Sequence, residues 1–290
     1  MIILNIGILG GDLRIIFLAK MLAKENNKIY TYGVDEKSFS NSNIIKCNLL
    51  EDISRNCSYI VSAIPFTKDG ININAPFNSK EIRIDDCLEI LKDKTIIAGA
   101  ITDEIKKEAV KNKIEIIDLM GNESFTILNV IPTVEGAIEY AMKNTKITIH
   151  NSNCLILGYG RIGKLLSKRL KDLDANVSVM ARKEKDLTWI KVYGYKYINI
   201  NNLENNLSGY DIIFNTIPAM ILNNERLKII KERSKSAVII ELASKPWGID
   251  FNKAEEYGLN VIKAQGLPGK VAPYTAAKYI KETIDKIIKQ

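Results

Sequence analysis

The chain has 290 residues, of which 46% are hydrophobic and 26% are charged. This composition is typical of a globular protein with enough apolar residues for two cores, and it excludes a disordered chain. The formal net charge of +7 comes from lysines scattered over many polar stretches, which indicates a solvated basic surface and no nucleic-acid partner.

The cysteines and the N-terminus bear on the compartment. The four cysteines are Cys47, Cys57, Cys87 and Cys154. They form no C-x-x-C pair and have no neighbouring histidine, so we expect no metal site, no disulfide framework and a reducing cytoplasm. The apolar start, residues 1–9, lacks a basic region and is interrupted by Gly10-Gly11-Asp12. It predicts a first strand and no membrane association.

In the first half, short β-branched runs alternate with amphipathic stretches. The expected strands are NIGIL, KIYTY, CSYIVSAI, TIIAGA and EIIDLM, with a helix over about residues 13–24 after the first. Such alternation is typical of a parallel α/β layer. Gly10-Gly11-Asp12 puts a carboxylate where a second glycine would approach a phosphate, and an anion there would be repelled. We therefore expect residues 1–125 to form a Rossmann-like substrate domain that has lost nucleotide binding.

A linker with one helix is expected over residues 126–150. Thr133 can cap this helix. Its apolar residues, at i, i+3, i+4, i+7 and i+8 spacing, are Val134, Ala137, Ile138, Ala141 and Met142. The spacing predicts an interdomain helix.

The alternation restarts after His150 with CLILG, a helix over about residues 161–173, NVSVMA, KYINI, DIIFNT, AVIIELA and NVIKA. Residues 151–274 therefore predict a second Rossmann domain. A last helix, over about residues 275–290, is expected to pack back on the first domain. The predicted fold class is α/β, with two Rossmann-like parallel-sheet domains separated by a cleft and joined by long interdomain helices. A cleft is the usual place for a ligand.

A glycine motif opens the second domain. Gly158-Tyr159-Gly160-Arg161-Ile162-Gly163 reads G-x-G-x-x-G, preceded by a strand and followed by a helix. In the dinucleotide fingerprint the first glycine makes a tight turn, the second lets the backbone approach a pyrophosphate, and the third permits close packing of the helix. The helix N-terminus then meets the phosphate charge. The motif predicts a nicotinamide dinucleotide.

The end of the next strand, Ala181-Arg182-Lys183, carries no carboxylate for the ribose hydroxyls. A guanidinium and an ammonium at this place suit a 2′-phosphate, so NADP is the expected cofactor. The alternative is that Arg182 and Lys183 are plain surface charges, with Glu184 close by.

Two later strand ends are expected to contact the nicotinamide half of the cofactor, because strand carboxyl ends face it in this architecture. They are Asn215-Thr216-Ile217-Pro218 and Ala243-Ser244. Pro218 could equally be an ordinary turn residue.

The catalytic groups are harder to identify. His150, the one histidine, lies eight residues before Gly158, roughly 25 Å away along an extended strand, so a histidine base is not expected. Glu135 and Lys245 are the candidate catalytic residues. The candidate substrate-binding residues are Thr67, Lys68, Thr133, Lys270 and the loop Gly266-Leu267-Pro268-Gly269, whose N–H groups could hold a carboxylate. For each side chain, a capping or solvated role is the alternative.

Together these segments resemble the A-subunit family of dipicolinate synthase over nearly the whole chain. The similar segments are GGDLR, IPTVEGAI, TIH, LGYGRIG, ARK, NTIPAMILN, ELASKPWG and GLPGKVAP. Trp247 and residues 66–78 depart from the family pattern. The resemblance implies oxidation of dihydrodipicolinate, or of its hydrated tetrahydro precursor, to dipicolinate with NADP⁺ during sporulation, in the cytoplasm of the mother cell. It also implies a flavoprotein-like partner, the B-subunit of dipicolinate synthase, and leaves open a homo-oligomer within the complex.

Two alternatives stay open. One is a non-catalytic NADP-binding module that regulates a partner enzyme. The other is a different NADP-dependent dehydrogenase, of the shikimate dehydrogenase type, since this fold hosts many functions.

Overall fold

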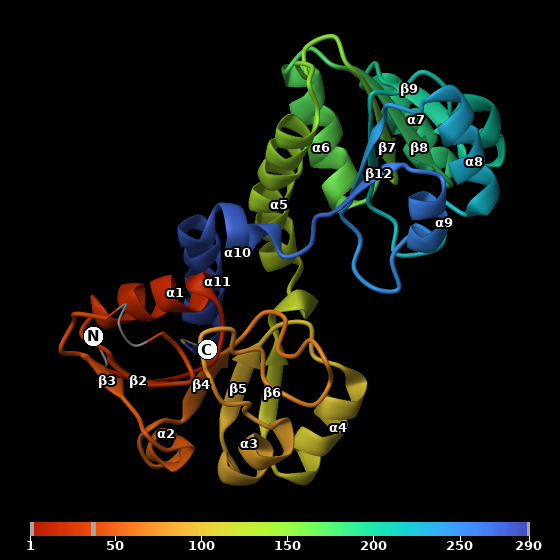
Figure 1. Cartoon of the computed structure of the whole chain (residues 1–290). Helices are drawn as coiled ribbons and strands as arrows, with labels where there is room; N and C mark the ends of the chain where they lie inside the picture. Colours follow the sequence, from red (N-terminus) through yellow and green to blue (C-terminus); the bar gives the residue numbers. More distant parts are fainter. Residues whose placement is uncertain (1–2, 36–38, 289–290) are drawn as a thin grey trace. The chain divides into compact units, whose positions relative to one another are not determined.

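The computed structural model describes residues 3–35 and 39–288 and divides the chain into two compact units. Unit 1 comprises Met1–Asn129 and Ala272–Gln290, and unit 2 comprises Val130–Val271. Each unit is built on a six-stranded parallel sheet with helices between its strands (Figure 1). The prediction of two Rossmann-like parallel-sheet domains is confirmed.

The sheet of unit 1 has the strand order β3-β2-β1-β4-β5-β6, and all its neighbouring strands are parallel. Its strands are β1 (Asn5–Leu9), β2 (Lys28–Tyr32), β3 (Ile44–Lys46), β4 (Tyr59–Ser62), β5 (Thr95–Ala98) and β6 (Glu115–Asp118). This is the doubly wound order, in which the chain reverses direction across the sheet between β1 and β4. The carboxyl ends of these two strands are therefore the topological switch point of unit 1.

Helices cover both faces of this sheet. Helices α1 (Leu13–Ala23) and α11 (Pro273–Ile288) lie side by side on one face (Figure 1). The other face is covered by α2 (Leu50–Asn56), α3 (Ile84–Ile90) and α4 (Asp103–Lys111). Along β1, Ile6 and Ile8 pack toward α1 and α11, and Leu9 packs toward the opposite core. Both faces are buried, which explains why the strands read as apolar runs. A short 3-10 helix, η2 (Leu119–Gly121), follows β6.

The sheet of unit 2 repeats the pattern, with the order β12-β11-β10-β7-β8-β9 and parallel neighbours throughout. Its strands are β7 (Asn153–Leu157), β8 (Asn176–Ala181), β9 (Lys196–Asn199), β10 (Ile212–Asn215), β11 (Val238–Glu241) and β12 (Asn260–Lys263). The switch point lies between β7 and β10, directly at the end of β7 where the glycine motif begins.

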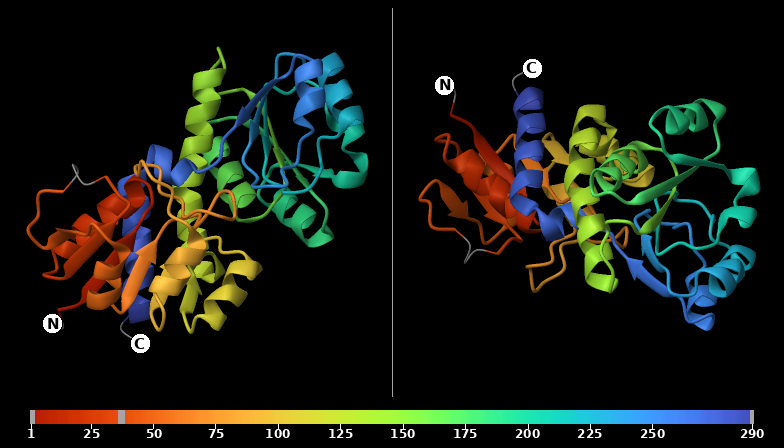
Figure 2. Two further views of the ribbon diagram at one scale, coloured as in Figure 1. Left: turned by 60° about the horizontal axis from the view of Figure 1, so that its bottom comes forward. Right: turned by 90° about the horizontal axis from the view of Figure 1, so that it is seen from above.

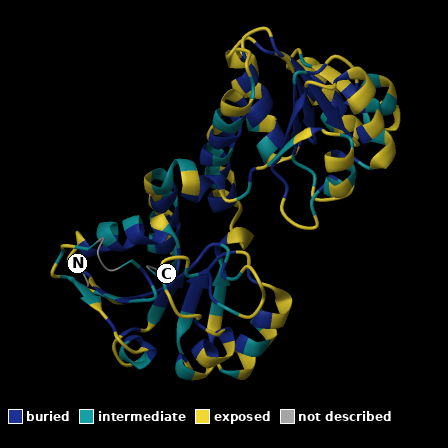
Figure 3. Cartoon of the chain, in the orientation of Figure 1, coloured by how far each residue is buried: buried dark blue, intermediate teal, exposed yellow. Residues whose placement is uncertain are grey.

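Helices cover both faces of the unit 2 sheet (Figure 2), and two buried clusters hold them onto it. One face is covered by α5 (Glu123–Asn144), α6 (Arg161–Asp172) and α7 (Glu184–Val192). The other is covered by α8 (Asn224–Arg233) and α9 (Phe251–Glu256), with the 3-10 turns η3 (Ile200–Asn202) and η4 (Glu204–Asn206) nearby. Figure 3 shows buried strands and exposed outer helix faces in both units. Within residues 3–35 and 39–288, none of the helices combines the length and the hydropathy that a membrane span requires.

Helix α5 begins eleven residues earlier than the sequence predicts. Its first turn is capped by Asn122, whose Oδ1 accepts a hydrogen bond from the backbone N–H of Phe125 at 2.9 Å. The helix then continues through Pro132, which lies inside it. A proline usually ends a helix or lies in its first turn, so its place inside this helix is unusual. Thr133 is instead a half-buried residue within the helix, so the predicted cap was wrong.

The segment Gly266–Gly269 was expected to be a loop, and this was also wrong, because Leu267–Val271 forms the short helix α10. The N–H of Gly269 donates to the carbonyl of Gly266 at 3.2 Å, and Pro268 has no N–H. Leu267 is buried and packs where a Cβ on Gly136 of α5 would stand. Apolar packing against α5 thus explains this segment better than a carboxylate-binding role does.

Candidate functional site

A cavity of about 550 Å³ opens at the carboxyl end of the sheet in unit 2. It is lined by Gly158, Tyr159, Gly160, Met180, Ala181, Arg182, Lys183, Asp186, Ile200, Thr216, Ile217, Pro218, Ala219, Met220 and Ile221. Most of these residues lie at or just after the carboxyl ends of β7, β8 and β10, so the cavity lies at the topological switch point. Ligands of doubly wound sheets bind at this place.

The three motif glycines each meet a different steric demand. Gly158 has φ +107°, and a Cβ there would stand 2.5 Å from the hydroxyl oxygen of Thr216. A Cβ on Gly163 would overlap the carbonyl oxygen of Gly158, so the third glycine lets α6 pack on the turn. A Cβ on Gly160, by contrast, would meet no heavy atom within 4 Å. The chain itself therefore has no steric need for glycine there, whereas a ligand against that backbone would.

The start of α6 adds a site for an anion. Gly160 is the N-cap residue of this 12-residue helix and supplies no side-chain hydrogen bond to its first turn. The first turn of a helix carries N–H groups that lack intrahelical partners and a partial positive charge. Together with the open space above Gly160, this fits a pyrophosphate.

The cavity wall beyond β8 carries the two cations, Arg182 and Lys183, that were predicted to bind a 2′-phosphate. Ala181 is buried, whereas Arg182 and Lys183 are exposed and line the cavity. Asp186, from the first turn of α7, lines it as well. Two cations against one carboxylate give this wall a net positive charge, which suits a phosphate group.

Asn215 was expected to bind the cofactor, but its side chain turns into the protein. Its Nδ2 donates to both carboxylate oxygens of Glu241, at 2.9 Å each, and to the carbonyl of Ile217 at 3.1 Å. Asn215 and Glu241 are both fully buried. The same carboxylate accepts the N–H of Ala243 at 2.8 Å. Asn215 therefore shapes the loop that lines the cavity and is not among the lining residues.

The remaining expected cofactor residues divide clearly. Thr216, Ile217 and Pro218 line the cavity, with the hydroxyl of Thr216 donating to the carbonyl of Leu157 at 2.8 Å. Arg161, Ile162, Gly163, Ala243 and Ser244 are not among the residues that line it.

Six lining residues were missed by sequence reasoning: Met180, Asp186, Ile200, Ala219, Met220 and Ile221. Met180 and Ala219–Ile221 adjoin predicted segments, so extending each strand end by a few residues would have found them. Ile200 comes from the turn after β9 and carries no chemical signal.

The candidate catalytic and substrate residues of unit 2 are spread over three elements. Glu135 and Thr133 lie on α5, and Lys270 is exposed on α10. Lys245 is exposed after β11, with its Nζ 5.5 Å from the ring centroid of Trp247. None of these four residues is among those that line the cavity.

In unit 1, Thr67 and Lys68 belong to a loop that is organised around Asp69. The Thr67 hydroxyl donates to Asp69 Oδ1 at 3.0 Å, and the same oxygen accepts the N–H groups of Ile71 and Asn72 at 2.8 Å each. These bonds hold the pKa of the Asp69 carboxyl well below its usual range. Thr67 therefore has a local structural role, and Lys68 is exposed.

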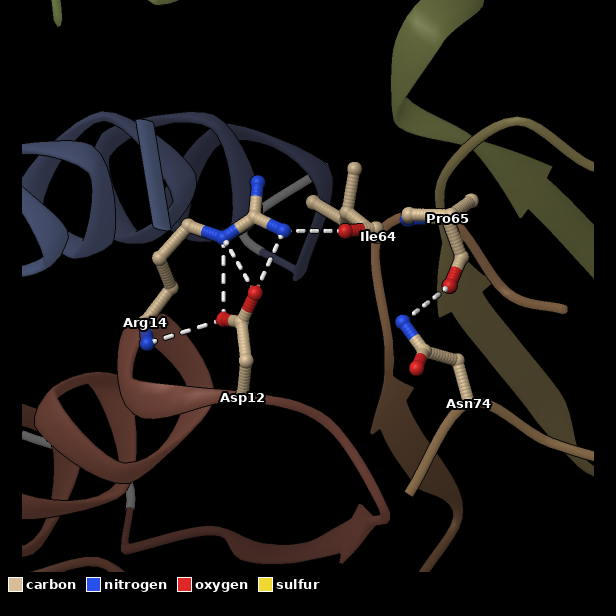
Figure 4. A network of polar contacts seen from close by, with 5 residues as sticks. All are labelled: Asp12, Arg14, Ile64, Pro65 and Asn74. Atoms are coloured by element: carbon tan, nitrogen blue, oxygen red, sulfur yellow. Dashed lines mark hydrogen bonds and ion pairs between the residues drawn. The ribbon is translucent and has the colours of Figure 1, made fainter. Parts of the chain in front are cut away.

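The glycine turn of unit 1 is closed by its own chain. The N–H of Gly11 donates to the carbonyl of Asn74 at 2.9 Å, and a Cβ on Gly10 would stand 3.0 to 3.3 Å from Ile73, Asn74 and Ala75. The Asn74 side chain in turn donates from Nδ2 to the carbonyl of Pro65 at 3.2 Å (Figure 4). Segment 73–75 thus occupies the space that a phosphate takes in a nucleotide-binding turn.

Other groups have no place in the chemistry of the cavity. His150 lies at the amino end of β7, the edge of the sheet opposite Gly158, with Nδ1 3.5 Å from Asp174.

Burial raises the pKa of the Cys57 and Cys87 thiols to about 12. Burial also raises the pKa of the Cys47 and Cys154 thiols to about 11, so the cysteines carry no thiolate at neutral pH. The described residues contain no group of three or more His, Cys, Asp or Glu that could hold a metal ion.

Comparison with known proteins gives two family matches, one on each side of the boundary between the two units. Residues 5–120 match the profile of the N-terminal domain of the dipicolinate synthase A-subunit, and residues 139–267 match that of shikimate / quinate 5-dehydrogenase. The dipicolinate synthase A-subunit of Bacillus subtilis is 31% identical over 98% of this chain and 96% of its own.

Two further similarities differ in extent. The crystal structure of the dipicolinate synthase A-subunit from Bacillus halodurans superimposes with a TM-score of 0.89 and 28% identity, covering 99% of this chain and 98% of that one. The shikimate dehydrogenase (NADP(+)) of Clostridium botulinum is 26% identical over 65% of this chain and 78% of its own.

Proposed function

Because the chain belongs to the dipicolinate synthase A-subunit family, we propose that this oxidoreductase subunit uses NADP⁺ to oxidise dihydrodipicolinate, or its hydrated tetrahydro precursor, to dipicolinate. The observation that carries the proposal is the cavity at the switch point of unit 2, which Gly160, Arg182 and Lys183 line together. The similarity of residues 139–267 to shikimate / quinate dehydrogenases supports a nicotinamide cofactor.

The lining residues fit NADP part by part. The turn from Gly158 to Gly160 and the start of α6 would hold the pyrophosphate, since the backbone is open there and the helix end attracts anions. Arg182 and Lys183 would hold the 2′-phosphate. Thr216 to Pro218 would flank the nicotinamide, because they directly follow β10, the strand next to β7. When bound, the nicotinamide ring supplies the hydride acceptor.

The chemistry explains why the site carries no histidine. Loss of a hydride and a proton from the dihydropyridine ring gives an aromatic pyridine, so a positioned acceptor matters more than a strong base. Glu135 and Lys245 remain our proposals for handling the proton. A doubly negative substrate would be favoured by cations, and Lys245 and Lys270 are exposed cations of unit 2.

The family membership also supports the remaining parts of the proposal. We infer a partner, the flavoprotein-like B-subunit of dipicolinate synthase, and action in the cytoplasm of the mother cell during sporulation. A homo-oligomer within that complex is compatible with the proposal.

The test is an assay of the purified chain with NADP⁺ and the product of dihydrodipicolinate synthase, with and without the B-subunit. Pyridine absorbance and NADPH formation are followed together, and we expect both to rise in step. NADPH formation only with the partner would assign catalysis to the complex. NADPH binding without turnover in either mixture would contradict the proposal and favour the non-catalytic NADP-binding module. Turnover of shikimate in place of the dihydropyridine would favour the shikimate dehydrogenase type.

A further inference from the structure

A buried arginine stands at the switch point of unit 1. Arg14 lies in the first turn of α1, directly after β1, and is 4% exposed. A buried guanidinium is costly unless it is paired and hydrogen-bonded. Asp12 supplies the pairing, because its Oδ1 accepts from Nε at 2.9 Å and its Oδ2 accepts from Nη2 at 2.8 Å. Nη2 also donates to the carbonyl of Ile64, in the segment that follows β4.

The remaining nitrogen of this guanidinium has no partner among the described residues. Asp12 and Ile64 engage Nε and Nη2, whereas the third nitrogen, Nη1, carries no dashed line in Figure 4 and points away from Asp12. No described residue forms a hydrogen bond or ion pair with Nη1. An arginine presents five N–H donors in a fixed fork, so the two on Nη1 are left for an acceptor from outside the chain.

The surroundings of Arg14 limit the size of the ligand that could supply this acceptor. Arg14 spans the ends of β1 and β4, which is the place where doubly wound sheets bind ligands. In unit 2 the equivalent place is the open cavity beside Gly160. In unit 1 the Asn74 carbonyl takes the N–H of Gly11, so a dinucleotide has no phosphate site there. A small ligand remains.

The setting also selects its chemistry. Asp12 is 27% exposed, and both its oxygens bind Arg14. It therefore fixes the plane of the guanidinium and pairs its charge. The pair is neutral as a whole, so it attracts a ligand through directed N–H groups and not through net charge. Planar carboxylates are the acceptors that match such a fork.

We propose that Arg14 binds one carboxylate of the cyclic dicarboxylate substrate through Nη1, and that Asp12 is the residue that positions it. The inference rests on the proposed function for the identity of the substrate. It assigns a substrate contact in unit 1 to Arg14 and not to the candidate Thr67, because the Thr67 hydroxyl already donates to Asp69.

The experiment measures binding of pyridine-2,6-dicarboxylate to the full-length chain by calorimetry, with NADPH present and with and without the proposed partner protein. Arg14→Gln should weaken binding of the dicarboxylate about tenfold or more, as expected for loss of a hydrogen bond to a charged group. Asp12→Asn, which keeps the guanidinium but loosens its orientation, should weaken binding less than Arg14→Gln does. Arg83→Gln is the matched control, since Arg83 pairs with Asp85 across the same two-residue spacing on the surface, at 3.4 Å. It should bind like the wild type.

The outcomes separate the two proposals. Absence of dicarboxylate binding in the wild type would overturn the proposed function. Binding in the wild type with equal affinity in Arg14→Gln would overturn the role of Arg14 alone. NADPH affinity and the melting curve report whether the variant has folded. Arg14→Lys provides the decision if Arg14→Gln does not fold: it keeps the charge but loses the fork, so unchanged binding there would also overturn the inference.

Discussion

The side-chain amide of Asn215 donates to both carboxylate oxygens of Glu241, at 2.9 Å each, with both residues fully buried. Asn215 ends β10 and Glu241 ends β11, so this contact joins the loops that follow two neighbouring strands. Gly248, in the second loop, packs so close that a Cβ there would overlap the Asn215 amide and the carbonyl of Ile217. The buried carboxylate thus sets the shape of the cavity wall at Ile217.

Glu241→Gln should destabilise the protein by about 1 to 3 kcal/mol. The substitution turns one carboxylate oxygen into an NH₂ donor that faces the N–H groups which donated to it, so a buried polar group loses its hydrogen bond. Equilibrium unfolding in urea measures the change. Glu232→Gln, an exposed residue of α8, is the control and should leave the free energy of unfolding within about 0.5 kcal/mol of the wild type. Equal stability of the two variants would show that Glu241 is not structurally important.

The same carboxyl group predicts a pH dependence of stability. Burial raises the pKa of Glu241 above its ordinary value of 4.5. Between that value and the higher folded-state pKa, the folded protein binds more protons than the unfolded chain, so this group's contribution to stability falls as the pH rises. Urea unfolding from pH 4 to pH 8 should show this slope in the wild type and a smaller one in Glu241→Gln. Parallel curves for the two proteins would contradict the assignment.

The elements that the sequence predicted well are those with local signals. The β7 strand and the glycine turn are encoded within eleven consecutive residues, by an apolar run buried on both faces and by three glycines with separate steric tasks. The exposed charges of Arg182 and Lys183 at the end of β8 follow from their place directly after a buried strand.

The missed features depend on contacts that are distant in sequence. The Asn215 amide looked available to a cofactor because its partner, Glu241, lies 26 residues later. Arg14 was not predicted as a candidate ligand-binding residue, because its buried position involves a hydrogen bond to the carbonyl of Ile64, 50 residues away. The start of α5 was misplaced because threonine is a common cap residue and Thr133 precedes an apolar periodic run, whereas the helix is capped by Asn122, eleven residues earlier.

The second and third motif glycines should respond differently to alanine. Gly163→Ala should destabilise the protein by about 1 to 3 kcal/mol, because its Cβ would overlap the backbone of the turn. Gly160→Ala should leave stability nearly unchanged, since its Cβ meets open space at φ −77°, but should weaken NADPH binding. Thermal unfolding and fluorescence titration with NADPH measure the two effects. Undiminished NADPH affinity in Gly160→Ala would argue against a cofactor on this turn.

Arg182→Ala tests the choice of phosphate. Arg182 is exposed on the cavity wall, so its removal should cost little stability. If it binds the 2′-phosphate, NADPH affinity should fall about 10- to 100-fold while NADH affinity changes little, because hydrogen bonds to a charged group contribute about 1.5 to 3 kcal/mol. Lys185→Ala removes an exposed cation that lies close in sequence and is not among the lining residues, and should leave both affinities unchanged. Equal losses of NADPH and NADH affinity in Arg182→Ala would rule out a phosphate-specific role. If Lys185→Ala lost as much NADPH affinity as Arg182→Ala, the effect would come from the general positive charge of this surface.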